Sequence, residues 1–283
     1  MSCTHPAAPR KQYRGEARAA PVRGEIGCRD AAPRGKLSAF LRPKVKPLRP
    51  DPAFDRSQTR PREPSILYFG TPVILVSTRN PDRTANLAPL SSVFWLGWRC
   101  VIAANPTSRT SENLIRERDC VVNLPRDDMA AAVDRLALTT GSDPVPQNKA
   151  RRGYIHHADK FGLCGLTQAP AATVGAPRAQ ECPVQLECKL VDARQLGAGQ
   201  PDMALAPYAF ELRVTRVWLA DDILAQDDFD RVDPDKWRLL MMSFQKFYGL
   251  GPQVAPSRLA TIPEPLYRGP DHERARHEPA RAP

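Results

Sequence analysis

"ANLAPLSSVFWLGWRCVIAANPTSRTSENLIRERDCVVNL", Ala85–Leu124, contains the pattern that decides the fold. The runs Ala85–Trp98, Arg99–Ala104 and Cys120–Pro125 are rich in β-branched, aromatic and other apolar residues, which is typical of strands. Between the second and third runs lies a polar turn followed by a short helical pattern. The stretch therefore predicts three strands, with one short helix before the last of them.

Working outward, we expect a mainly β protein. Further strands are predicted over Ile66–Thr78, Ala171–Ala176, Cys182–Leu196 and Tyr208–Leu224, a helix over Asp127–Gly141 that begins at Asp127 or Asp128, and a partly helical last segment over Asp235–Gly251. Within the third of these strands Gln185, Glu187 and Lys189 alternate with apolar residues, which predicts one wet face. Many strands, few helices and no β-α-β alternation favour an antiparallel barrel or sandwich.

The net charge of +10 is concentrated at the N-terminal end. Residues 1–63 hold 15 of the 41 basic residues but only 6 of the 31 acidic ones, and they are rich in proline. Such a segment buries too little apolar surface to fold, so we predict a disordered leader without the apolar core of a secretory signal. It is either a nucleic-acid-binding arm or a non-functional extension. Residues 256–283 are predicted to be a C-terminal extension that is disordered at its end.

The seven cysteines are odd in number, form no CxxC pair and fall largely in strand-like runs. They indicate buried thiols in a reducing cytoplasm rather than a disulfide framework. No apolar run approaches the roughly 20 residues of a membrane span. Outside the two ends, the histidines offer only the adjacent pair His156 and His157, whose spacing does not suit a zinc site, so no metal is expected.

The motifs of common enzyme classes are missing from this sequence. It contains no GxGxxG after a strand, no GxxxxGK[ST], no GxSxG and no HExxH. Since no protein nucleophile stands out, a bound cofactor is one way to supply the chemistry.

Two polar features are candidate binding sites. The first is the helix start, where Ser108, Arg109, Thr110 and Asn113 surround amides that carry partial positive charge, and an anion such as phosphate would fit there. The alternative is ordinary capping by Ser108 or Thr110, with Arg109 in solvent and Leu114 and Ile115 on the apolar side of the helix.

The second feature is "NLAPLSS", residues 86–92. Pro89 interrupts the predicted strand and marks an edge or bulge, while Ser91 and Ser92 add hydroxyl groups. A flat heteroaromatic ring with polar edges would suit such a strip. The alternative is a plain barrel corner.

Together these features resemble the flavin reductase-like, FMN-binding split-barrel family over roughly residues 64–255. The resemblance rests on the order of motifs through "FGTPVILVSTRNPDRTANLAPLSSVFWLGWRCVIAANPTSRTSENLIRERDCVVNLP" and continues into "DKFGLCGLTQAPAATVGAPRAQECPVQLEC". It implies a six-stranded antiparallel Greek-key split β-barrel with a few short helices, a homodimer, and FMN near the dimer interface. Relatives usually have glycine in the first turn, where this chain has Arg83.

The resemblance also implies site residues. Ser108, Arg109, Thr110 and Asn113 would hold the FMN phosphate, and Asn86, Leu87, Ala88, Pro89, Ser91 and Ser92 would line the ring system. No catalytic side chain is required, because the flavin carries the hydride. Tyr154, His157 and Phe161 are candidates on the substrate side, with a solvated loop as the alternative, and Phe244–Gly251 either closes the site or forms a packed helix.

We therefore expect an FMN-binding oxidoreductase, an NAD(P)H-dependent flavin reductase-like protein that transfers hydride through bound FMN. One alternative is a non-enzymatic flavin- or haem-binding split barrel. Another is a nucleic-acid-associated protein that uses the basic leader.

Overall fold

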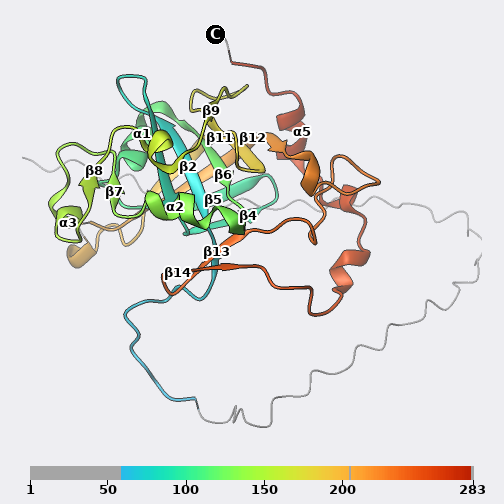
Figure 1. Cartoon of the computed structure of the whole chain (residues 1–283), viewed down its shortest axis with the longest axis horizontal. Coiled ribbons are helices and arrows are strands. Elements are labelled where there is room, and N and C mark those ends of the chain that lie inside the picture. Colours follow the sequence, from blue (N-terminus) through green and yellow to red (C-terminus); the bar gives the residue numbers. More distant parts are fainter. Residues whose placement is uncertain (1–58, 204, 282–283) are drawn as a thin grey trace, which may run out of the picture. The chain divides into compact units, whose positions relative to one another are not determined.

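The main sheet of the protein is antiparallel and has the strand order β3-β2-β6-β11-β12-β5-β4 (Figure 1). The computed structural model describes residues 59–203 and 205–281, which belong to the compact unit Pro52–Pro283. The strands of this sheet are β2 (Ile74–Arg79), β3 (Ala85–Leu90), β4 (Val93–Leu96), β5 (Arg99–Ala104), β6 (Asp119–Leu124), β11 (Val184–Gln195) and β12 (Tyr208–Leu219). Most of the predicted leader therefore lies outside the described residues.

The sheet curls into an open barrel because its two edge strands are neighbours in sequence. β3 and β4 lie at opposite ends of the strand order, yet only Ser91 and Ser92 separate them. Two residues span at most about 7 Å, so the two edges must approach each other. The amide of Ala103 donates to the carbonyl of Ser92 at 2.9 Å and holds this corner against β5. The predicted split-barrel fold is confirmed, and the predicted run Ala85–Trp98 supplies both edges.

Smaller elements surround this barrel. The short strands are β1 (Thr71–Pro72), β7 (Thr139–Thr140), β8 (Ile155–His156), β9 (Gln168–Ala169), β10 (Arg178–Ala179), β13 (Leu240–Ser243) and β14 (Lys246–Gly249). The α-helices are α1 (Arg109–Glu117), α2 (Ala130–Arg135), α3 (Gln147–Ala150), α4 (Lys160–Cys164) and α5 (Pro270–Arg276). The 3-10 helices are η1 (Asp127–Met129), η2 (Pro201–Met203), η3 (Asp221–Ile223), η4 (Arg258–Thr261) and η5 (Glu264–Tyr267). Within the described residues no helix is long and apolar enough to cross a membrane.

The apolar residues form two main clusters, one inside the barrel and one between the sheet and the helices α2 and α4. Ile102, Leu114 and Phe210 belong to the first cluster, and Leu87 and Phe161 belong to the second. The two clusters use opposite faces of the sheet, as the period of two along a strand requires. Cys100, Cys120, Cys164, Cys182 and Cys188 are all buried free thiols.

The first hairpin explains how the chain tolerates Arg83 where relatives have glycine. The amide of Arg83 donates to the carbonyl of Asn80, and Arg83 has a φ of 71°. This is a three-residue loop that ends in a left-handed residue, a position at which glycine is favoured. The predicted turn is therefore formed, at some conformational cost.

Two predicted elements differ from the structure. The helix expected over Asp127–Gly141 is only the short pair η1 and α2, and Asp127 and Asp128 do not cap it. Ala171–Ala176 is not a strand but an irregular segment. Pro89 marks an edge strand, as the sequence predicted, and β3 continues through it because an edge strand tolerates proline.

The last predicted segment was assigned the wrong type. Instead of a partly helical stretch, β13 and β14 form a hairpin that pairs with β1 (Figure 1). Its two-residue turn, Phe244–Gln245, has positive φ at both residues, as a type I′ turn requires. Phe244, Phe247 and Tyr248 therefore do not form a helix face.

The predicted wet face of β11 is in fact covered. Gln185 is 6% exposed and Glu187 is fully buried. Both Glu187 carboxylate oxygens accept hydrogen bonds from the irregular segment, from the amides of Ala172 and Thr173 at 2.8 and 2.6 Å, and Trp218 Nε1 donates at 2.7 Å. Polar residues on this face can thus be buried because another segment supplies their hydrogen-bond partners.

The C-terminal end also differs from its prediction as disordered. Helix α5 packs on β12, and Asp271 accepts a hydrogen bond from Arg99 Nε at 2.7 Å. Beyond the helix, Glu278 accepts from Lys189 at 2.6 Å and from Arg213 at 2.9 Å. These ion pairs account for order in a segment with little apolar content.

Candidate functional site

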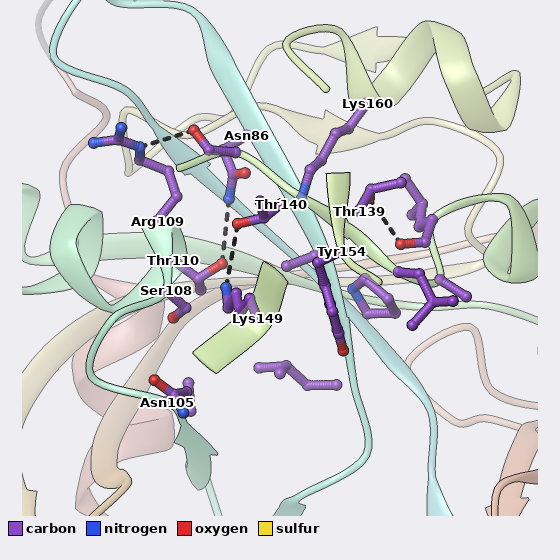
Figure 2. Close-up of a pocket in the computed structure, with 18 residues that line it drawn as sticks. Asn86, Asn105, Ser108, Arg109, Thr110, Thr139, Thr140, Lys149, Tyr154 and Lys160 are labelled. Atoms are coloured by element: carbon purple, nitrogen blue, oxygen red, sulfur yellow. Dashed lines mark hydrogen bonds between the residues drawn. The ribbon is translucent and has the colours of Figure 1, made fainter. Parts of the chain in front are cut away.

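A cavity of about 180 Å³ lies where the edge strand β3 meets the N-terminus of α1 (Figure 2). It is lined by Asn86, Ala88, Pro89, Leu90, Ala104, Asn105, Ser108, Arg109, Thr110, Leu136, Ala137, Leu138, Thr139, Thr140, Gly141, Lys149, Tyr154 and Lys160. Three of these side chains are basic and none is acidic. The cavity therefore favours an anionic ligand.

The start of α1 contributes its amide groups to this cavity. The first hydrogen bond of the helix runs from the amide of Glu112 to the carbonyl of Ser108 at 3.1 Å. The amides of Arg109 and Thr110 precede it, so they have no carbonyl of the helix to bond and carry partial positive charge. Ser108 is the N-cap, since its hydroxyl accepts from the amide of Ser111 at 3.1 Å. The capped turn is therefore also the turn whose first amides have no carbonyl partner within the helix.

The other hydroxyls of this turn are used in local structure. Thr107 donates from its amide and its hydroxyl to Asn105 Oδ1, at 2.9 and 2.8 Å. Ser111 is buried and its hydroxyl donates to the carbonyl of Asn105 at 2.8 Å. The abundance of hydroxyls is therefore largely explained by the tight entry to the helix.

Asn86 connects β3 to α1 through buried hydrogen bonds. Its Nδ2 donates to Thr78 Oγ1 at 3.3 Å and to Thr110 Oγ1 at 3.2 Å. Asn86 Oδ1 is buried and has no partner among the described residues. A buried acceptor without a donor is costly, so a ligand hydroxyl or ring N–H at this point would remove a penalty.

Gly141 allows the opposite wall to approach Asn86 closely. A Cβ at this position would lie 2.4 Å from Asn86 Oδ1 and 3.2 Å from Arg109 Cγ. The carbonyl of Gly141 also accepts from Arg109 Nε at 3.1 Å. Glycine is thus required here for space.

Two lysines enter the cavity from α3 and α4 (Figure 2). Lys149 Nζ donates to Thr140 Oγ1 at 3.2 Å and lies 5.8 Å from the ring centre of Tyr154. Burial lowers the pKa of Lys149, while the carboxylate of Glu112 acts to raise it. Lys160 is only 3% exposed, and its burial together with the charge of Lys149 lowers its pKa to about 8.

The predicted site residues are brought together only in part. Asn86, Ala88, Pro89, Ser108, Arg109, Thr110 and Tyr154 line the cavity. Leu87, Ser91, Ser92, Asn113, His157 and Phe161 do not. Leu87 and Phe161 are core residues, because alternate residues of β3 face opposite ways and Phe161 packs inward from α4.

Asn113 and His157 hold structure next to the cavity. Asn113 is buried, and its Nδ2 donates to Thr78 Oγ1 at 3.0 Å and Asn80 Oδ1 at 2.9 Å, so it joins α1 to the first hairpin. His157 donates its amide to the carbonyl of Thr140 at 2.9 Å. These contacts explain the Asn113 side chain, whereas His157 is held through its backbone and its ring Nδ1 is buried without a partner among the described residues.

Sequence reasoning missed both lysines and the wall Leu136–Gly141. The wall was assigned to a helix, whereas Leu138 has a φ of 54° and turns the chain into β7. Lys149 and Lys160 lie in a region that reads as a polar loop. One signal in the sequence was Asp159, which is a typical helix cap. It begins α4, the helix in which both Lys160 and Phe161 are buried.

Fold and cavity together define an open antiparallel barrel with a cavity at a helix N-terminus whose lining has basic but no acidic side chains. The chain belongs to the flavin reductase like domain family, whose family model matches residues 66–250. It is 30% identical over 192 residues to the uncharacterized protein YdfE of Bacillus subtilis (strain 168), which covers 68% of this chain and 89% of that protein. The resemblance predicted from the sequence is confirmed.

Solved structures with a similar fold include two flavoredoxins. That of Desulfovibrio vulgaris (Miyazaki F) has a TM-score of 0.58 and 18% identity, covering 72% of this chain and all of the other. That of Methanosarcina acetivorans has a TM-score of 0.57 and 20% identity, covering 72% of this chain and 97% of the other. These likenesses extend to the split-barrel fold.

Proposed function

We propose that this protein is an FMN-binding oxidoreductase that uses NAD(P)H to reduce flavin or a small acceptor. The observation that carries the proposal is the cavity at the start of α1, with three basic side chains and no carboxylate on its walls. Membership of the flavin reductase like family supports a flavin as the ligand. The phosphorylated form, FMN, follows from the positive charge of the cavity.

The residues of the cavity fit such a ligand. Ser108, Arg109 and Thr110, with the first amides of α1, would hold the phosphate. Asn86 offers an unpaired buried oxygen to a hydroxyl or ring N–H. β3 pairs on one side only, with β2, so its edge leaves backbone groups for polar ring atoms near Ala88 and Pro89.

A bound flavin would supply two-electron hydride chemistry. The protein's own residues bind and orient the ligand and exclude water from it. Leu90 on one wall and Leu136 and Leu138 on another provide apolar surface for a flat ring. Tyr154 is the candidate that faces a second substrate, because it lines the cavity while only partly buried.

The remaining parts of the proposal concern the assembly and the chain. We take residues 64–255 as the flavin-binding domain, and propose a homodimer in a reducing, cytoplasmic setting. The buried thiols are consistent with such a setting, since Cys100, Cys120, Cys164, Cys182 and Cys188 are unpaired.

The test is anaerobic reduction of the FMN-loaded protein. After purification and incubation with FMN, the protein is expected to show flavin absorbance that NADH or NADPH bleaches without oxygen. Protein that takes up no FMN would refute the cofactor assignment. Binding without bleaching by either nucleotide would refute the enzymatic activity and leave flavin binding intact.

A further inference from the structure

The three cations of the cavity differ in what they already bind. Arg109 Nε donates to the carbonyl of Gly141 at 3.1 Å, and its Nη1 pairs with Glu112 Oε2 at 2.9 Å. Among residues 59–203 and 205–281, no carboxylate oxygen lies within 4.0 Å of the Lys149 or Lys160 ammonium. Arg109 thus has a carboxylate partner within the described residues, whereas Lys149 donates only to the Thr140 hydroxyl and neither lysine has a carboxylate partner there.

The lysine pair is electrostatically unfavourable when the cavity holds no anion. Both ammonium groups are withdrawn from water, Lys160 almost completely, and the charge of Lys149 disfavours the charge of Lys160. The groups that face Lys160 include Lys149 from α3, Arg109 from α1, and the Cys164 thiol of its own helix. Buried charges are normally paired, so an arrangement of this kind calls for an anion from outside.

We propose that Lys149 and Lys160 together bind the phosphate dianion of the ligand and thereby set a preference for FMN over riboflavin, whereas Arg109 mainly holds the cavity wall at Gly141. This rests on the proposed function and changes one part of it, because Arg109 would then support the phosphate site through the wall while Ser108, Thr110 and the first amides of α1 still contact the phosphate. Two ammonium groups balance the two charges that a phosphate monoester carries above its second pKa of about 6. Figure 2 shows both lysine side chains pointing into the cavity that the start of α1 also lines.

The lysine pair gives the phosphate preference a pH dependence. Burial and the charge of Lys149 lower the pKa of Lys160 to about 8, so Lys160 loses its proton as the pH rises through 8. Binding a dianion favours the charged ammonium and therefore requires a proton from solution above that pH. FMN affinity is expected to fall up to tenfold per pH unit above about pH 8, while riboflavin affinity, which needs no such charge, does not follow this change.

The experiment compares FMN and riboflavin binding by flavin fluorescence in matched single variants. Lys149→Met and Lys160→Met keep the side-chain length and remove one charge, and Arg109→Met does the same for the arginine. Arg152→Met is the control, because Arg152 is exposed, lies between the two lysines in the chain and does not line the cavity. Each lysine variant is expected to bind FMN roughly 10- to 100-fold more weakly.

Riboflavin affinity in these lysine variants is expected to stay within about threefold of wild type. Arg109→Met is expected to weaken both flavins to a similar extent, and Lys160→Met to lose the pH dependence above 8. The inference would be overturned if the lysine variants lost affinity for both flavins. It would also be overturned if Arg109→Met were the variant that lost affinity for FMN and not for riboflavin. Melting curves check folding, and Lys160→Met is expected to melt no lower than wild type, since it removes a buried charge.

Titration with inorganic phosphate separates this inference from the proposed function. A rise in melting temperature with phosphate that disappears in both lysine variants supports the lysine pair, even if no flavin binds. Wild-type protein that binds phosphate but no flavin would thus refute only the proposed function. Wild-type protein that binds neither refutes both.

Discussion

Replacing Glu187 by glutamine is expected to lower the free energy of unfolding by about 3 to 6 kcal/mol. Glu187 Oε2 accepts from the amide and the hydroxyl of Thr173, at 2.6 and 2.5 Å, while Oε1 accepts from Ala172 and Trp218. A glutamine keeps the shape but presents an NH₂ group to two of these donors. Each lost hydrogen bond to a charged acceptor costs about 1.5 to 3 kcal/mol, and two such losses give the range.

Urea unfolding followed by tryptophan fluorescence measures this cost at pH 7. Glu181→Gln is the matched control, because Glu181 accepts from the amide of Thr167 but is exposed, so a change below about 0.5 kcal/mol is expected. A cost below about 1 kcal/mol for Glu187→Gln would refute the view that this carboxylate fixes the segment beside β11.

The same pair of proteins has a defined pH dependence. Burial, the strongest influence, acts to raise the pKa of Glu187, but hydrogen bonds from Thr173, Ala172 and Trp218 together lower it. A lowered pKa means that the stabilisation is complete above the unfolded value of about 4.3 and is lost as the pH falls through the folded value. The difference between wild type and Glu187→Gln is expected to shrink below about pH 4, and a constant difference would contradict the assignment.

Three further predictions test other parts of the structure. Gly141→Ala places a Cβ 2.4 Å from Asn86 Oδ1 and is expected to weaken the binding of both FMN and riboflavin roughly tenfold. Gly251→Ala is the control, because Gly251 lies in open space, and it is expected to leave both affinities unchanged. Flavin affinities of Gly141→Ala equal to those of wild type in a fluorescence titration would contradict the close approach. Arg83→Gly is expected to raise the free energy of unfolding by about 0.5 to 1 kcal/mol, because the position has positive φ; a loss of stability in urea would contradict this. Burial acts most strongly, to raise the pKa of Glu278, but Lys189 and Arg213 hold it below its usual value. Since this stabilisation is present above about pH 4.3 and lost in acid, hydrogen exchange in residues 270–281 is expected to lose protection selectively as the pH falls below 4; protection unchanged relative to the barrel would refute the ion-pair account.

The barrel strands could be predicted because their pattern is local. Arg99–Ala104 is a strand with the predicted bounds. β6 was predicted as Cys120–Pro125 and is Asp119–Leu124, so both of its ends lie one residue earlier than predicted. Ile115 is 47% exposed although it was placed on the apolar side of α1, because only Leu114 reaches the core. Where one face of an element is buried, the sequence pattern alone predicts the type of the element and places its ends within about one or two residues.

The failures share a physical cause, which is dependence on distant partners. The β13–β14 turn has positive φ at Phe244 and Gln245, so neither turn position carries the Gly or Asn that would indicate a hairpin. The covered face of β11 depends on a segment that begins at Ala171, and the burial of Lys160 depends on how α4 packs against β3. The local pattern of apolar and polar residues does not predict contacts with such distant segments.

The closure of the barrel also sets the order in which the cavity can form. β5 pairs with β12, which joins Arg99 to Arg213, a contact between residues far apart in the chain. Such distant pairings are slow to form, because the entropy of a long loop is lost before the contact is gained. Ala104 and Asn105 line the cavity at the end of β5, so we expect this wall to be in place only after β5 has paired with β12. We therefore expect added ligand to slow unfolding while leaving the rate of refolding almost unchanged, since the binding walls meet after the rate-limiting step.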